Sequence, residues 1–185
     1  MDASGVWSPA AITPSASTAR SPSWTSSPAW GAAPAVVEGN TYADVVHYGI
    51  RHDDPNVPED GQVVWRAYGD GLPYSVSTVT VTGGGRLTLS PGVVVKFDRH
   101  QGLVVYGSLE AEGTASEPIV LTGDTDDVGG DTNGDGTETQ PEPGWWNSVQ
   151  FQDGSSGVLS HCRIRYAGYW EDAAVVCRGG AAPTV

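Results

Sequence analysis

Between Val79 and Leu121, short apolar runs alternate with turns rich in Gly, Pro and Ser, and no run has helical spacing. The runs recur at a nearly constant interval. Val79–Val81 returns as Leu103–Val105, 24 residues later (103 − 79), and Arg86–Leu89 returns as Ser108–Ala111, 22 residues later (108 − 86). Three strands in each unit of about two dozen residues, with no helix between them, predict a β-solenoid.

Alternation within the strands predicts which side chains face the core. Val93, Val95 and Phe97 should point inward, and Lys96 should point outward. We expect strand 86–89 to stack in parallel on 108–111, and strand 93–97 on 118–121, at an offset of 25 residues for the second pair (118 − 93). The residues predicted to be buried are Leu89, Val95, Phe97, Leu103, Val105, Leu109, Ile119, Leu121, Phe151 and Ile164.

The repeat also divides the chain into regions. Residues 1–34 are a Ser-, Ala- and Pro-rich low-complexity segment, predicted to be a disordered leader, and 35–74 are predicted to form an N-terminal cap. Residues 75–185 should form an all-β solenoid of about three coils, interrupted by an insertion at 122–146. The chain ends within a coil and shows no polar C-terminal cap, which indicates truncation.

Three segments carry a resemblance to a known architecture. The segments LTLSPGVVVKF, GLVVYGSLEAEGTASEPIVLTG and SSGVLSHCRIRYAG resemble the right-handed parallel β-helix of bacterial secreted and surface repeat proteins, an architecture shared with pectate-lyase-like enzymes. The resemblance covers Leu72 to Val185 and implies a secreted or cell-surface location. It leaves the activity open, because one fold hosts many functions.

The insertion contains a calcium-type motif. Asp131-x-Asn133-x-Asp135-Gly136, followed after five residues by Glu142, places oxygen-bearing side chains at alternate positions of a tight loop, as Ca²⁺ requires. Prolines on both sides of Glu142 exclude a helix leaving the loop. The alternative is a solvated acidic loop. The candidate ligands are Asp124, Asp126, Asp127, Asp131, Asn133, Asp135, Thr137 and Glu142.

Four aromatic residues flank the coil that follows the insertion. Trp145, Trp146, Tyr169 and Trp170 are candidates for stacking against sugar rings, and the alternative is that they pack under the insertion. Pectate-lyase-like enzymes pair calcium-bound acids with an arginine base, a role that the resemblance would give to Arg163 or Arg165. No active-site motif of that family accompanies these arginines.

Composition narrows the class of partner. The net charge is −13 with only 9 Lys and Arg residues, which argues against binding to nucleic acid or to an anionic membrane. No apolar run is long enough for a membrane span, and the N-terminus lacks the pattern of a signal peptide. Cys162 and Cys177 have no metal-type spacing; free thiols are the first interpretation and a disulfide is the alternative.

Three functions remain as hypotheses. The leading hypothesis is a non-catalytic, calcium-stabilised β-helix that serves as a scaffold or interaction segment, with a polysaccharide or another surface protein as partner. The alternatives are a polysaccharide lyase or hydrolase, which would require acids and an arginine gathered in one groove, and a carbohydrate-binding module, which would require a row of exposed aromatic rings.

Overall fold

The computed structural model describes residues 40–69 and 71–185, so the predicted leader at 1–34 lies outside this part of the chain. The described residues form strands and turns without helices. The strands are β1 (Ile50–His52), β2 (Asn56–Val57), β3 (Gln62–Trp65), β4 (Tyr74–Val76), β5 (Val79–Val81), β6 (Arg86–Leu89), β7 (Val94–Phe97), β8 (Leu103–Val105), β9 (Ser108–Glu112), β10 (Ile119–Gly123), β11 (Val149–Phe151), β12 (Ser156–Ser160), β13 (Cys162–Ile164) and β14 (Val175–Cys177).

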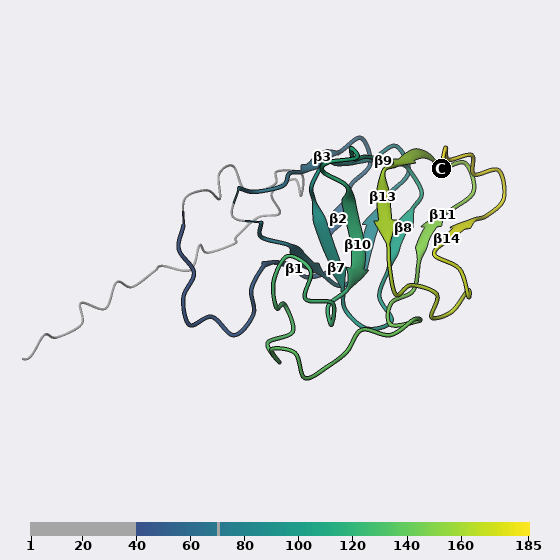
Figure 1. The fold of residues 1–185 in the computed structure, drawn as a ribbon. Helices are drawn as coiled ribbons and strands as arrows, with labels where there is room; N and C mark the ends of the chain where they lie inside the picture. The colour runs from purple at the N-terminus through teal and green to yellow at the C-terminus, as the bar shows by residue number, and fades with distance from the viewer. Residues whose placement is uncertain (1–39, 70) are drawn as a thin grey trace, which may run out of the picture.

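The strands assemble into three parallel sheets that wind around a common core (Figure 1). Sheet A has the order β1-β4-β7-β10-β13, sheet B the order β14-β11-β8-β5-β2, and sheet C the order β12-β9-β6-β3. Each successive coil adds one strand to each sheet, and a bridge from Val158 to Thr184 continues sheet C in the last coil. The prediction of an all-β parallel solenoid is confirmed.

The number of coils was predicted wrongly, since the solenoid has about five coils rather than three. The first coil, formed by β1, β2 and β3, lies within the region that the sequence analysis assigned to an N-terminal cap. In its first strand His52 holds the position that Val76 and Phe97 hold in the next two coils, so the apolar repeat is interrupted there, and the second strand has only two residues.

The predicted register is confirmed for sheet C, where Arg86 lies opposite Ser108. In sheet A the predicted pair of strands is also parallel, but Val94 lies opposite Val120, which makes the offset 26 residues (120 − 94) instead of 25. A shift of one residue would turn each side chain to the other face of the sheet, so the packing of the core selects the correct register.

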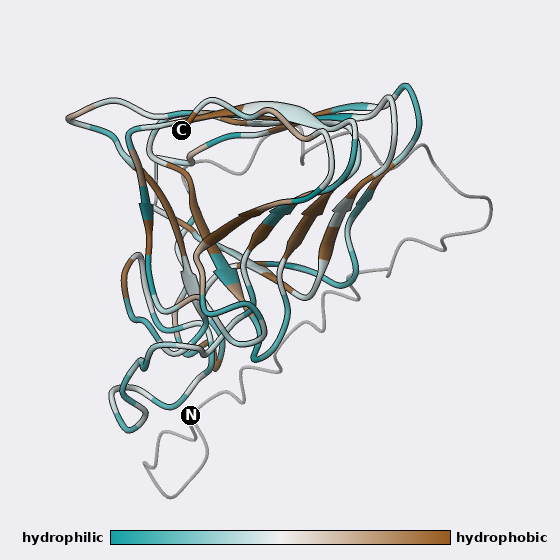
Figure 2. Cartoon of the chain, turned by 90° about the vertical axis from the view of Figure 1, so that its right-hand side faces the viewer, coloured by the Kyte–Doolittle hydropathy of each residue, from teal (hydrophilic) through white to brown (hydrophobic). Residues whose placement is uncertain are grey.

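The core fills the inside of the solenoid. Hydrophobic residues concentrate along the strands and hydrophilic residues in the turns (Figure 2). All the predicted core residues are buried, except that Ile164 in the last coil is only partly buried. Both cysteines are free thiols, and burial raises the pKa of the Cys162 thiol to about 11.

Lys96 lies on the outer face of sheet A, as predicted, but this face is not open to solvent at that position. The exposed fraction of Lys96 is 0% because the insertion covers it. The alternation of side chains could predict the face, and only the path of a distant loop decided that this face is covered.

Candidate functional site

The insertion crosses the outer face of sheet A and contacts both ends of the solenoid. Near the first coil, the backbone N–H of Tyr48 donates to the carbonyl oxygen of Asp131 over 2.7 Å, and Nδ1 of His47 lies 3.0 Å from the carbonyl oxygen of Thr132. At the last coil, the backbone N–H of Trp145 donates to the carbonyl oxygen of Tyr166 over 2.9 Å. The insertion therefore acts as a strap along the solenoid.

Beneath the strap, polar side chains form two columns on the outer face of sheet A. Parallel register places equivalent residues of successive coils about 4.8 Å apart. The first column contains Arg51, Ser75, Lys96 and Thr122, and Arg165 follows the strand that continues it. The second column contains Asp53, Ser77, Asp98 and Asp124, each following the last paired residue of its strand.

Two members of the first column hold the strap. The ammonium of Lys96 donates to the carbonyl oxygen of Gly130. Burial lowers the pKa of Lys96, and the nearby carboxylate of Asp126 opposes this shift. Asp126 itself is buried, accepts a hydrogen bond from the Thr122 hydroxyl over 2.7 Å, and lies 3.0 Å from an Nη1 of Arg165. Asp126 thus has its charge compensated within the fold.

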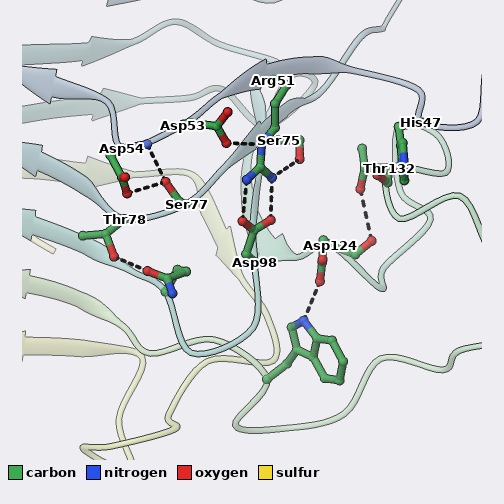
Figure 3. Close-up of polar contacts among 12 residues, drawn as sticks. His47, Arg51, Asp53, Asp54, Ser75, Ser77, Thr78, Asp98, Asp124 and Thr132 are labelled. Atoms are coloured by element: carbon green, nitrogen blue, oxygen red, sulfur yellow. Dashed lines mark hydrogen bonds and ion pairs between the residues drawn. The ribbon is translucent and has the colours of Figure 1, made fainter.

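Arg51 links the two columns (Figure 3). Its Nη1 and Nη2 donate to the two carboxylate oxygens of Asp98 over 2.6 and 2.7 Å. Its Nε donates to Asp53 over 2.7 Å, and Nη1 also donates to the hydroxyl of Ser75 over 3.2 Å. The bidentate pair with Asp98 raises the pKa of Arg51, which remains a cation at any working pH.

Asp124 occupies the next position of the second column after Asp98. Its Oδ1 accepts a hydrogen bond from the indole N–H of Trp145 over 2.5 Å (Figure 3). Burial raises the pKa of the Asp124 carboxyl, the Trp145 hydrogen bond opposes this, and the negative charge of Asp98 adds to it. Among the ion pairs of the described residues, none involves Asp124.

These groups line a cleft of about 430 Å³. The segment 47–49 also lines the cleft, together with Thr132 and Asn133 of the strap. Arg51, Ser75, Asp98 and Asp124 supply the remaining polar lining. Sequence reasoning missed this cleft, although one signal was available: Asp98 and Asp124 are 26 residues apart (124 − 98), which is the offset between β7 and β10.

The structure places the calcium-motif residues in a tight loop of the strap. The two carboxylate oxygens of Asp131 accept the backbone N–H groups of Gly134 and Gly136, each over 2.7 Å. Oδ1 of Asn133 accepts the N–H of Asp135 over 3.3 Å, and Oδ2 of Asp135 accepts the N–H of Thr139 over 3.1 Å. Within residues 40–69 and 71–185, no group of three or more His, Cys, Asp or Glu side chains is arranged to hold a metal ion.

The other predicted ligands lie apart from this loop or on its surface. Asp126 is engaged with Arg165, and Asp124 faces the cleft. Asp127, Thr137 and Glu142 are exposed. The structure therefore brings Asp131, Asn133 and Asp135 together and separates Asp126 from them.

The four candidate aromatic residues divide into buried and exposed ones. Trp146 is fully buried and stacks on Phe97, with ring centroids 4.4 Å apart, so its faces cannot receive a sugar. Trp145 is half-buried under the guanidinium of Arg99. Tyr169 and Trp170 are 37% and 68% exposed, and their ring centroids are 4.7 Å apart in a T-shaped arrangement.

The fold and its covered polar face define a parallel β-solenoid protein. Over 68 residues the chain is 36% identical to Protein bark beetle of Drosophila melanogaster; this similarity covers 35% of the chain and 2% of that protein. No family model and no solved structure matches the chain. In the described part of the chain, no helix is long and apolar enough to cross a membrane.

Proposed function

We propose that the chain is a non-catalytic solenoid segment of a secreted or cell-surface protein, a scaffold or interaction module that Ca²⁺ stabilises through the strap. The observation that supports this proposal is the strap itself. It is bonded to the segment before β1 at one end and to the residues after β13 at the other, so ordering the strap also ties the first coil to the last.

The loop around Asp131 is the part of the strap that fits a hard cation. Its carboxylate oxygens each accept one N–H group, and each retains a lone pair for a metal. Asn133, Asp135, the carbonyl of Thr137 and Glu142 would complete an oxygen ligand set, and Ca²⁺ accepts six to eight such ligands in flexible geometry. A cation there would also offset the repulsion between the carboxylates of Asp131 and Asp135.

The test is a thermal melt in EDTA and in excess Ca²⁺ at constant ionic strength. An ion that binds only the folded state stabilises it by about 2.7 kcal/mol at a hundredfold excess over Kd. We expect the melting temperature to rise with Ca²⁺, and Asp135→Ala to abolish the rise. The control Glu112→Ala removes an exposed acid from sheet C and should leave the rise intact. Equal melting temperatures of the unmodified chain in both buffers would refute the calcium site.

A second candidate function is carbohydrate binding, because Tyr169 and Trp170 form an exposed aromatic pair. Tyr169 is held by stacking on the ring of His100, with centroids 3.6 Å apart, and a fixed ring gives a sugar a preorganised surface. Titration with neutral and acidic oligosaccharides should change the tryptophan fluorescence, and Trp170→Ala should remove the change. Retention of the change in Trp170→Ala would assign the signal to another tryptophan and reject this site.

A further inference from the structure

The cleft beside Asp98 and Asp124 has a charge balance that favours one class of ligand. Arg51 is the guanidinium in its lining, and two carboxylates of the second column, Asp98 and Asp124, line it as well. Lys96 acts on Asp124 electrostatically, but it is fully buried under the strap, donates to Gly130 and does not line the cleft. The site therefore carries an excess of negative charge.

An anionic ligand would fit this cleft poorly. The Arg51 guanidinium already donates to Asp98, Asp53 and Ser75, so an incoming anion would have to displace a bidentate carboxylate. It would also meet Asp124, which accepts a hydrogen bond from Trp145 and forms no ion pair among the described residues. A positively charged ligand meets neither obstacle.

The size and acceptors of the cleft favour an organic cation over a metal ion. Its volume of about 430 Å³ lies within the range of small-molecule sites, which is about 300–1,000 Å³. An ammonium group has three donors and is satisfied by three acceptors. The cleft offers the carboxylates of Asp98 and Asp124 and the hydroxyl of Ser75.

We propose that this cleft binds an organic cation, an ammonium or guanidinium group, with its charge next to the carboxylates of Asp98 and Asp124. The group comes either from a Lys or Arg side chain of a polypeptide that lies along the strap or from a free amine. The cleft shares Asn133 with the calcium-type loop around Asp131, whereas the charged groups proposed to hold the cation, Asp98 and Asp124, lie outside that loop.

The experiment uses the indole N–H of Trp145 as a reporter, because that group donates directly to Asp124. Its NMR signal is followed while the whole chain is titrated with lysine and arginine blocked at both ends by amide groups, with putrescine, and with blocked norleucine as the uncharged analogue. We expect saturable shifts with the cationic probes and none with norleucine. Tighter binding of the blocked amino acids would indicate a polypeptide source, and tighter binding of putrescine a free amine.

Two variants make the test specific. Asp124→Asn keeps an oxygen for the Trp145 hydrogen bond and removes the charge, so it should weaken binding of the cationic probes by about tenfold or more. Asp127→Asn removes an exposed charge from the same strap outside the cleft and should leave affinity unchanged. Equal binding by Asp124→Asn, equal binding of norleucine, or a reporter that responds to Ca²⁺ and to no amine would overturn the proposal. Absence of a Ca²⁺-dependent rise in melting temperature would refute the calcium site and would leave the proposed cation binding in the cleft standing.

Discussion

Replacing Phe97 by Ala should strongly destabilise the solenoid. Phe97 has an exposed fraction of 0% and lies in β7, between Val76 of β4 and Gly123 of β10. Gly123 contributes no side chain at this level, and the indole of Trp146 stacks on the Phe97 ring at 4.4 Å between centroids. The ring therefore joins two coils to the end of the strap.

The size of this destabilisation follows from the loss of the buried ring and the loss of its stacking on Trp146. Truncating a buried Phe to Ala costs about 3–5 kcal/mol of unfolding free energy, because apolar contact is lost and a cavity remains. A stacked aromatic pair adds about 0.5–1.5 kcal/mol beyond its buried area. We expect Phe97→Ala to lower the unfolding free energy by about 5 kcal/mol in total, a large share of the 5–15 kcal/mol of unfolding free energy that is typical of a folded domain. The conservative change Phe97→Leu should cost less than half of this.

The assay is urea unfolding followed by circular dichroism and tryptophan fluorescence. With a slope of about 2 kcal/mol per M, Phe97→Ala should lower the midpoint by roughly 2.5 M or leave the chain unfolded, and Phe97→Leu keeps the measurement possible in that case. The double variant with Trp146→Ala should cost less than the sum of the single changes, because the two rings touch. A cost below about 1 kcal/mol for Phe97→Ala would contradict the packed column.

Two further predictions concern the first coil and a close approach of backbones. His52 is half-buried beside the stacked rings of Trp65 and Tyr74, and burial lowers its pKa below 6.5, against the weaker opposing effect of Asp53. The unfolded chain then binds the proton first, so stability should fall as the pH drops from about 7 to 5, and His52→Phe should flatten this dependence in denaturant titrations at each pH. A Cβ on Gly107 would collide with the carbonyl oxygen of Gly85, so Gly107→Ala should lower the unfolding free energy by about 1–3 kcal/mol in the same urea assay. The control is Gly69→Ala, whose Cβ meets nothing within 4 Å and should cause no such loss. Equal urea midpoints for the two variants would contradict this reasoning.

The sequence alone was sufficient for the parallel solenoid and most of its core. The reason is physical: a coil cannot bury its apolar face alone, so residues such as Leu87 and Leu109 must recur at the spacing that stacks them. The same alternation placed Lys96 on the outer face of sheet A. The first coil was missed, because His52 stands where the next coils have the apolar residues Val76 and Phe97 and β2 has only two residues.

Only the tertiary structure decided what the polar residues do. Asp124, Asp126 and Asp131 look alike in the sequence of the insertion, yet one faces a cleft, one pairs with Arg165 and one closes a loop of backbone N–H groups. Their surroundings are set by residues far along the chain, including His47 and Arg165. Local composition determines that such a segment is acidic, whereas contacts between distant coils determine which carboxylates keep a free charge.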